Sequence, residues 1–395
     1  MTDRAFRALR WLSLLVFGCL LAPGVSAAAP GVHAKAVVFG QSACFSGPNR
    51  QLGIHYRAGL LAAFAERNAK GGVNGRSLEL ISLDDGYEPK MAAANAERFA
   101  SKDDVLAVIG GVGTPTAKRI VPVLRAAGIP FVGHITGADF LGDFKRNPHV
   151  VNLRASYLQE LRAMVDHVVR KRGKKRFGIL YQDDAFGRSV LKNYQTVLRE
   201  HGLHILAKSA FSRNTHAVHA GLFILAKADL DAILIVGPYA ANAEIINLAN
   251  GLGHDYIIGN LSFVLSSELR KRVETPSDRI LVTEVMPSPT DTKRRIVRSY
   301  QRALRAASER EAGPAPPVFN ELSLEGYILG RFVITVLERL GDEWTRERFL
   351  QQALASGVVL IDDWAVEFQP GTNVGAKFVR LTDLGQRIDG GRGQP

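Results

Sequence analysis

Short apolar runs alternate with longer amphipathic stretches along most of the chain. The apolar runs are rich in Val, Ile and Leu, as buried strands are, and the amphipathic stretches repeat their apolar residues at helical spacing. This alternation predicts an α/β fold in which helices cover parallel sheets. The expected strands are 36–40, 78–83, 105–110, 130–134, 177–182, 204–210, 232–237, 256–260 and 280–285, and the expected helices are 51–68, 89–100, 116–127, 157–172, 187–201, 215–226, 240–251, 293–310 and 321–340.

The pattern pauses at residues 139–156, which are loop-rich, and a second series of helix and strand units begins at Tyr157. A proline-marked stretch at 284–292 predicts a second crossing between two doubly wound lobes. A chain that crosses repeatedly makes a hinge, with a ligand in the cleft. We expect an N-terminal lobe of 36–153 plus 286–340, a C-terminal lobe of 154–285 plus 341–385, and a flexible tail of 386–395.

Residues 1–27 have the layout of a secretory signal peptide: three arginines, an apolar stretch and small residues up to Ala27. Cleavage near Ala27 predicts a periplasmic protein. The alternative is a lipoprotein processed just before Cys19, although Phe17 is bulky where such sites prefer small residues. Cleavage near Ala27 leaves Cys44 as the single cysteine, which excludes an intramolecular disulfide.

The formal net charge of +12 does not by itself indicate a nucleic-acid partner, because an exported protein has little access to nucleic acid. The only dense basic run is "RKRGKKR" at 170–176, between an expected helix and an expected strand. A solvated basic turn explains it simply, and a specific polyanion site is the alternative.

Motifs of the common enzyme classes are missing from the sequence. It has no Gly-x-Ser-x-Gly, no His-Glu-x-x-His, no Cys-x-x-Cys and no Walker lysine loop. His216 and His219 lie three apart but have no third ligand at a recognisable spacing, so we expect no metal. We therefore expect a protein that is not an enzyme and needs no cofactor.

The glycine-rich turn "GGVGTPT" at 110–116 joins an apolar run to a helix and suggests anion binding. As a dinucleotide fingerprint it fails, because Thr116 stands where the third glycine is needed. The helix start and the hydroxyls of Thr114 and Thr116 suit any anion, including a carboxylate. The alternative is that the two threonines only cap the helix; this segment leaves both interpretations open.

Residues 46–99, from "SGPNRQLG" through "NAKGGVNGR" to "SLDDGYEP", closely resemble the start of the type I periplasmic solute-binding proteins of the leucine/isoleucine/valine-binding class. The segments "VIGGVGTPT", "GIPFVGHITGA", "RASYLQE", "YQDDAFG" and "SLEGYILGRFVITVLERLG" extend the resemblance over about 36–380. The resemblance implies two α/β lobes, a three-crossing hinge, a monomer, and closure around a small solute that an ABC permease in the inner membrane takes up.

The resemblance also implies the binding site, with Thr114 as the anchor for a carboxylate. The expected ligand-binding residues are Thr114, Thr136, Gly137 and Ala138 as donors, Leu52 as a wall, Phe186 and Tyr239 as aromatic covers, and Tyr157 at the rim near the hinge. Phe263 and Tyr87 are further aromatic candidates, for which core packing is the alternative interpretation.

The sequence departs from the resemblance in two respects. The disulfide of the leucine-type binders would join the positions of Tyr87 and Gly113, and the acid that holds the ligand's α-ammonium is replaced in the segment 261–263, "LSF". A buried ammonium without an anion costs several kcal/mol. The sequence therefore favours a carboxylate with an apolar or aromatic body, unless Asp183 or Asp184 supplies the anion. A ligand-sensing subunit and an exported α/β enzyme are the alternative functions.

Overall fold

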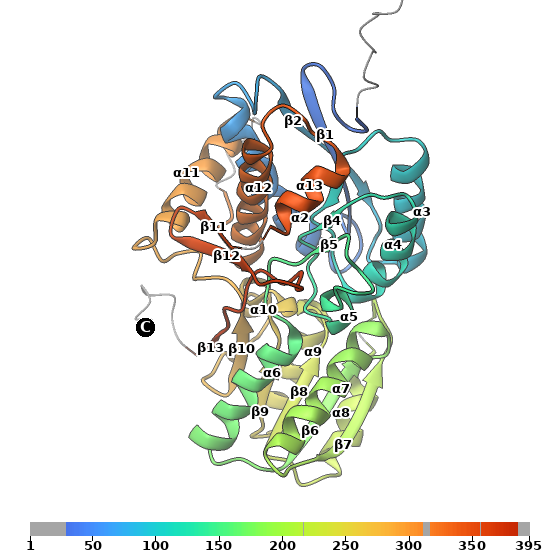
Figure 1. Cartoon of the computed structure of the whole chain (residues 1–395). Helices are drawn as coiled ribbons and strands as arrows, with labels where there is room; N and C mark the ends of the chain where they lie inside the picture. Colours follow the sequence, from blue (N-terminus) through green and yellow to red (C-terminus); the bar gives the residue numbers. More distant parts are fainter. Residues whose placement is uncertain (1–28, 216, 311–316, 356, 386–395) are drawn as a thin grey trace, which may run out of the picture.

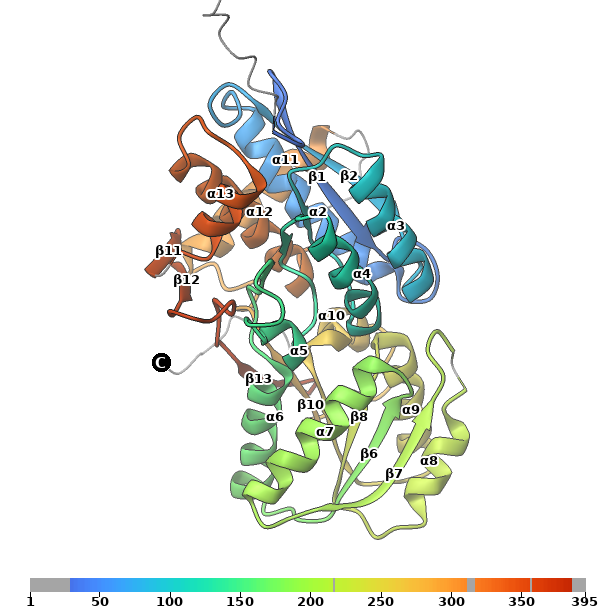
Figure 2. The ribbon, with the colours of Figure 1, turned by 45° about the vertical axis from the view of Figure 1, so that its right-hand side comes forward.

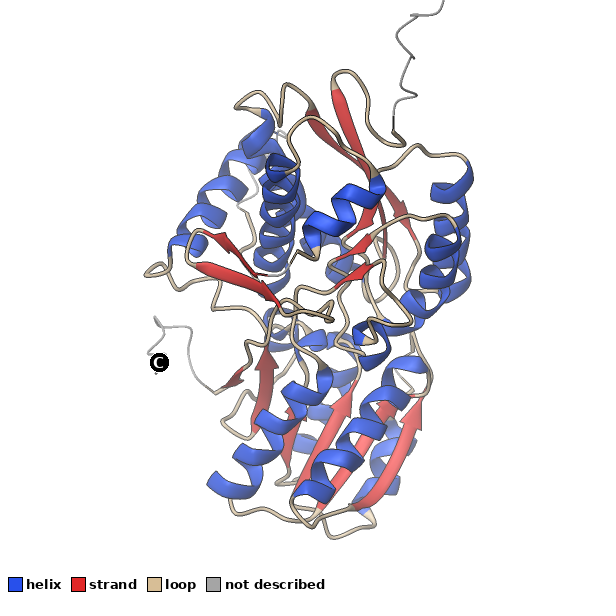
Figure 3. Ribbon diagram, in the orientation of Figure 1, coloured by secondary structure: helices blue, strands red, loops and turns tan. Residues whose placement is uncertain are grey.

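The computed structural model describes residues 29–215, 217–310, 317–355 and 357–385, and it contains one large sheet in each of two lobes (Figures 1 and 3). The expected signal peptide, with Cys19 and Ala27, and the expected tail at 386–395 lie outside these residues. The N-terminal sheet has the order β2-β1-β3-β4-β5 and is parallel throughout. Its strands are β1 (Ala36–Ala43), β2 (Ser77–Asp84), β3 (Ala107–Ile109), β4 (Phe131–Val132) and β5 (Val150–Val151).

The C-terminal sheet has the order β13-β10-β9-β8-β6-β7, and only β13 runs antiparallel. The expected α/β architecture of two parallel-sheet lobes is thereby confirmed. The strands are β6 (Phe177–Gln182), β7 (Ile205–Phe211), β8 (Ala232–Val236), β9 (Ile257–Asn260), β10 (Ile280–Glu284) and β13 (Arg380–Asp383).

Helices cover both faces of each sheet (Figure 2). Most expected helices are found within a few residues, whereas the short elements α5 and α10 and the helix α13 were not expected. The N-terminal lobe contains α2 (Arg50–Asn68), α3 (Pro89–Ser101), α4 (Thr114–Ala126), α5 (Asp139–Gly142), α11 (Arg295–Arg310), α12 (Glu321–Arg339) and α13 (Arg346–Ala353). The C-terminal lobe contains α6 (Tyr157–Asp166), a π-helical turn (His167–Lys171), α7 (Ala185–Glu200), α8 (His219–Ala226), α9 (Tyr239–Gly251), a 3-10 turn (Ser262–Val264) and α10 (Ser266–Arg270).

The expected assignment of all of 341–385 to the C-terminal lobe is wrong for α13. Phe349 of α13 packs its ring 6.1 Å from that of Phe39 in β1. Arg346 donates to the carbonyl oxygens of Val105, at 2.8 Å, and Ala127, at 3.3 Å. Burial of Phe349 in the N-terminal core thus holds this helix on the N-terminal lobe.

The hairpin of β11 (Gly357–Ile361) and β12 (Trp364–Phe368) also belongs to the N-terminal lobe. The Phe368 ring lies 6.2 Å from Phe332 of α12, and the Asp363 carboxylate accepts from the N–H of Ile296 at 2.7 Å, at the start of α11. Of the described residues in 341–355 and 357–385, only those of β13 join the C-terminal sheet, where β13 pairs with β10.

The N-terminal core depends on an unusually close approach of α2 and α12. A Cβ atom at Gly59 would overlap the carbonyl oxygen of Ser323, and one at Gly326 would overlap that of Tyr56. The Tyr56 hydroxyl donates to the carbonyl of Gly133 at 2.6 Å. Glycine therefore sets the spacing of the two helices, and Tyr56 ties α2 to the loop after β4.

We expect Gly59→Ala to lower the free energy of unfolding by about 2 kcal/mol, because the added methyl group meets rigid backbone and the helices must separate. Urea unfolding measures this change. Gly251→Ala is the matched control, since a Cβ at that helix end meets nothing within 4 Å, and its stability should be unchanged or slightly higher. Equal stability of both variants would contradict the close packing.

Candidate functional site

Three hydroxyl groups converge at the start of α4. The hydroxyls of Thr114, the first residue of α4, and Thr136, in the loop after β4, lie 2.6 Å apart, and both side chains are buried. Tyr157 begins α6, and burial raises the pKa of its hydroxyl to about 12, while Arg154 and the two threonine hydroxyls act to lower it. That hydroxyl is buried beside the two threonine hydroxyls and makes no hydrogen bond of ordinary geometry to them. The cluster can therefore donate to an anion that reaches it.

The glycine-rich turn does not end in a side-chain cap. Gly113 has φ 96°, and no side chain caps α4. The Thr116 hydroxyl bonds back to the carbonyls of Val112 and Gly113. Of the two threonines of the turn, only Thr114 directs its hydroxyl toward the cluster, and the interpretation of both as helix caps is not what the structure shows.

Four buried aromatic rings lie next to one another between the lobes. Ring centroids are 5.2 Å apart for Tyr157 and Phe186, 4.7 Å for Phe186 and Phe263, and 5.9 Å for Phe263 and Tyr87. Each side chain is at most 1% exposed. Tyr87 comes from the N-terminal lobe and the other three come from the C-terminal lobe, so this group of rings, which we call the aromatic wall, joins the two lobes.

Tyr87 adopts a backbone conformation that is rare for a residue with a side chain, with φ 62°. The Asp85 carboxylate supports the turn by accepting from the N–H of Tyr87 at 2.9 Å. The Tyr87 ring lies directly on Gly113, where a Cβ would overlap it. Tyr87 and Gly113 are thus adjacent, as expected of two positions that a disulfide joins in the leucine-type binders. In this chain the Tyr87 ring packs on Gly113 where those proteins have the disulfide.

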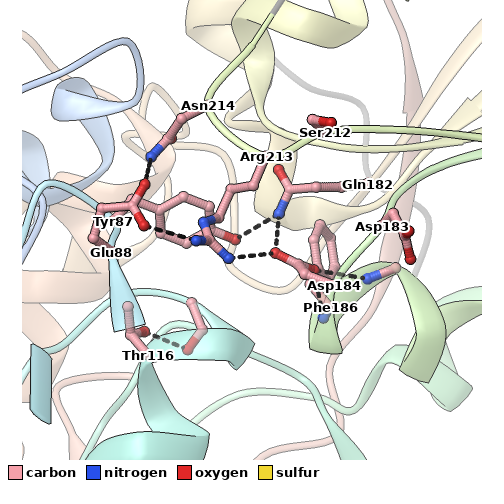
Figure 4. Close-up of polar contacts among 12 residues, drawn as sticks. Tyr87, Glu88, Thr116, Gln182, Asp183, Asp184, Phe186, Ser212, Arg213 and Asn214 are labelled. Atoms are coloured by element: carbon pink, nitrogen blue, oxygen red, sulfur yellow. Dashed lines mark hydrogen bonds and ion pairs between the residues drawn. The ribbon is translucent and has the colours of Figure 1, made fainter. Parts of the chain in front are cut away.

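Asp183 and Asp184, the two alternative partners for a ligand's ammonium, are both already in use. Asp184 caps α7 by accepting from the N–H of Phe186 at 2.8 Å, and it also accepts from Nε2 of Gln182 at 2.6 Å (Figure 4). Its carboxylate lies 3.5 Å from Arg213. Asp183 is exposed and pairs with Arg188. Neither carboxylate is left for a ligand.

The loop after β7 carries a contact between the lobes that was not expected from the sequence. Arg213 donates to Glu88 at 2.7 Å, and Asn214 donates to the same carboxylate at 2.6 Å (Figure 4). Asn214 also accepts from Asn49 at 2.7 Å. We call Arg213, Asn214 and Glu88 the clamp. Its residues are ordinary loop residues distant in sequence, so no motif marks them.

A buried charge group lies at the hinge behind the rings. Arg154 donates to the Ser262 hydroxyl at 2.6 Å and its Nε lies 3.7 Å from Glu325 of α12. Glu160 accepts from the N–H and hydroxyl of Ser262, at 2.8 and 2.9 Å, and from Thr283 at 2.6 Å. The carboxylate nearest to segment 261–263 is therefore occupied by the fold.

The remaining expected residues take different places. Leu52 is fully buried in α2, and Gly137 leaves no room for a Cβ against the N–H of Tyr157. Ala138 is buried and donates its N–H to the Thr136 hydroxyl at 3.2 Å. Tyr239 does not join the aromatic wall: its hydroxyl donates to the carbonyl of Pro48, in the other lobe, at 2.6 Å.

Within the described residues, no group of three or more His, Cys, Asp or Glu side chains could hold a metal ion. His219 is exposed and lies 3.2 Å from Glu244, and His216 is outside the described residues. A search of the same residues found no helix long and apolar enough to cross a membrane.

The sequence matches the family model described as periplasmic binding protein over residues 36–369. A possible leucine/isoleucine/valine-binding protein from Rhodopirellula baltica SH 1 is similar in structure, with a TM-score of 0.82 and 32% identity, over 89% of this chain and 95% of that one. A substrate-binding periplasmic protein from Ralstonia solanacearum has a TM-score of 0.80 and 26% identity, over 88% and 97% of the two chains.

A curated relative, Leu/Ile/Val-binding protein homolog 7 of Brucella suis biovar 1 (strain 1330), is 27% identical over 217 residues. That match covers 53% of this chain and 54% of the relative, so it spans about half the length of each.

We expect Arg213→Gln to weaken closure of the lobes, because Glu88 and Asp184 each lose their cationic partner. Small-angle X-ray scattering of the unliganded protein should show a larger radius of gyration than for the unchanged protein. Arg188→Gln is the control, since its exposed pair with Asp183 lies within the C-terminal lobe. Scattering curves that are identical for both variants would rule out the clamp as a closing contact.

The turn under Tyr87 predicts a dependence of stability on pH. Burial raises the pKa of Asp85 to about 7, although the Ser42 hydroxyl and the Tyr87 N–H act to lower it. The folded protein therefore keeps a proton that the unfolded chain releases above about pH 4, so stability should fall as pH rises from about 4 to about 7, by at most about 1.4 kcal/mol per unit. Urea unfolding at several pH values measures this slope.

Asp85→Asn should flatten the slope between pH 4 and 7, and Asp183→Asn, which changes an exposed carboxyl group, should leave it as it is. A slope that stays the same in Asp85→Asn would assign the titration to another group.

Proposed function

Because this chain belongs to the periplasmic binding proteins of the leucine/isoleucine/valine-binding family, we propose that it is the solute-binding component of an ABC importer for a small carboxylic acid with an apolar or aromatic body. Proteins of this family bind substrates and are not enzymes. The proposal places the protein in the periplasm, after removal of the leader at residues 1–27, and gives it an inner-membrane ABC permease as its partner.

The buried cluster of three hydroxyls, from Tyr157, Thr114 and Thr136, is the observation that carries the proposal. The Tyr157 hydroxyl makes no hydrogen bond of ordinary geometry within it. A buried hydroxyl that is poorly satisfied is costly, and an acceptor that enters the cluster removes that cost. A carboxylate is such an acceptor, and the uncapped start of α4 adds backbone N–H groups and the positive end of the helix dipole.

The aromatic wall supports an apolar body for the ligand. Phe186, Phe263 and Tyr87 lie in contact across the cleft and are closed to solvent. Rings of this kind accept aliphatic or aromatic groups by burial and by edge-to-face contact. A polar body such as a sugar would lose its hydrogen bonds to water there without replacement.

The charges near the cleft disfavour a ligand with an α-ammonium group. Asp184 is occupied by the start of α7, by Gln182 and by Arg213. Glu160 is occupied by Ser262 and Thr283 and lies near the buried Arg154. An ammonium in the closed cleft would therefore lack an anionic partner, at a cost of several kcal/mol.

Matched pairs of solutes test the ligand class directly. Calorimetric titration would compare leucine with 4-methylpentanoate and phenylalanine with 3-phenylpropanoate, each acid being the amino acid without its ammonium. We expect the acid of a pair to bind more tightly than the amino acid, and its amide to bind weakly. Tighter binding of the amino acids would overturn the ligand class, and native mass spectrometry of the gently purified protein would identify the natural solute.

Import is tested separately from ligand class. Deletion of the gene should abolish uptake of the identified radiolabelled solute, and expression of the unchanged protein should restore it. Uptake at the normal rate in the deletion strain would contradict the role in import.

We expect Thr114→Ala to weaken binding of the identified acid about 10-fold to 100-fold, as loss of one hydrogen bond to a charged group does. Calorimetry gives the dissociation constant. Thr114→Ser keeps the hydroxyl and should bind within a few-fold of the unchanged protein. Thr196→Ala, which removes an exposed hydroxyl on α7, should have no effect. Unchanged affinity in Thr114→Ala would show that the anchor lies elsewhere.

A further inference from the structure

One side of α11 carries a row of arginine side chains. Arg298, Arg302 and Arg305 are exposed and follow one another at intervals of four and three residues, which places them on one side of the helix. The other side is buried in the N-terminal lobe through residues that include Val297 and Tyr300. We call Arg298, Arg302 and Arg305 the arginine ridge.

None of the three ridge guanidinium groups has a carboxylate partner among the described residues. Arg298 donates to the backbone carbonyls of Thr292 and Lys293, at 2.7 and 2.8 Å. Arg302 donates to the Ser299 hydroxyl at 3.4 Å. The Arg305 guanidinium stacks on the Phe319 ring at 5.0 Å. Like charges three or four residues apart repel one another on a helix, so the ridge is a surface that an external anion would stabilise.

The basic run at 170–176 behaves differently. Arg170 lies 3.6 Å from Asp166, Arg172 lies 3.1 Å from Asp278, and Arg176 lies 2.8 Å from Asp231. Most of its charge is thus balanced within its own lobe, in agreement with a solvated basic turn. Dense basic sequence is neutralised there by the fold, whereas on α11 it is not.

The ridge is also remote from the cleft. Helix α11 lies on the outer flank of the N-terminal lobe, and α2 and α12 separate it from α4 (Figures 1 and 2). It packs on α2 and belongs to one lobe only. A partner that recognises the closed state has to touch both lobes, so the ridge suits a surface whose contact does not depend on closure.

We propose that the arginine ridge binds the phosphate groups of an anionic lipid bilayer and holds the protein transiently against the membrane surface. The guanidinium fork matches phosphate oxygens, and the contacts of Arg298 and Arg305 hold their side chains in place before binding, which reduces the entropy lost. Three arginines near an anionic surface together supply roughly a hundredfold in partitioning, reversibly and with strong dependence on salt.

Sedimentation with lipid vesicles tests this. The protein is mixed with vesicles of phosphatidylglycerol and phosphatidylcholine, or of phosphatidylcholine alone, at low and at physiological salt. We expect sedimentation with the anionic vesicles only, decreasing as salt rises. In the combined variant Arg298→Gln, Arg302→Gln and Arg305→Gln, the partition coefficient onto anionic vesicles should fall roughly a hundredfold. The melting temperature and the solute affinity of this variant should stay unchanged.

The matched control is Arg170→Gln, Lys171→Gln and Lys175→Gln, which removes the same charge from the other lobe and should still sediment. Should the triple ridge variant unfold, Arg302→Gln alone, which removes one long hydrogen bond to Ser299, should weaken sedimentation several-fold. Equal loss in ridge and control variants would show an effect of net charge only, and no sedimentation of the unchanged protein would overturn the proposal. Binding of the ridge to an acidic protein in place of vesicles would overturn it as well.

Discussion

The buried guanidinium of Arg154 is the constraint on which the geometry of the site depends. It lies on the first crossing between the lobes, contacts Ser262 in the C-terminal lobe and lies near Glu325 in the N-terminal lobe. A buried charge that loses its partners is strongly destabilising, so the crossing has little freedom to move away from Ser262 or Glu325. Tyr157 follows three residues later, so the position of its hydroxyl and ring is fixed by the same buried contacts of Arg154.

The candidate site combines hydrogen-bonding groups at one end with aromatic rings at the other. Hydroxyl groups from α4, the loop after β4 and the start of α6 form a polar end, and the aromatic wall forms an apolar end. Tyr87 contributes the only ring from the N-terminal lobe, and its left-handed backbone and the bare Gly113 beneath it bring that ring to the cleft. The polar end lies at the junction of the lobes. The contact of Tyr87 with Phe263 and the clamp join the two lobes, whereas the other three rings of the wall share the C-terminal lobe.

Periodicity located the strands well because parallel strands buried on both faces are continuous apolar runs; β6 begins and ends at the expected residues, 177 and 182. It failed where an element is short or amphipathic and takes its place only through packing, as with β5 and α13. For the candidate site, the resemblance named Thr114, Tyr157 and Phe186, and in the structure these three residues are neighbours. It could not show that Asp184 is occupied by the start of α7, or that Tyr239 turns to the Pro48 carbonyl, because both facts depend on neighbours distant in sequence.

Beyond residue 28 the chain has one cysteine, and Cys44 is fully buried, with its thiol donating to the Asn49 carbonyl at 3.3 Å. Burial raises the pKa of this thiol well above its usual range, so the reactive thiolate is scarce at neutral pH. Within residues 29–395, an introduced surface cysteine would therefore be the thiol that maleimide dyes modify. The protein is therefore suited to conversion into a fluorescent reporter. A dye attached to one introduced cysteine between the lobes would change its fluorescence when the lobes move.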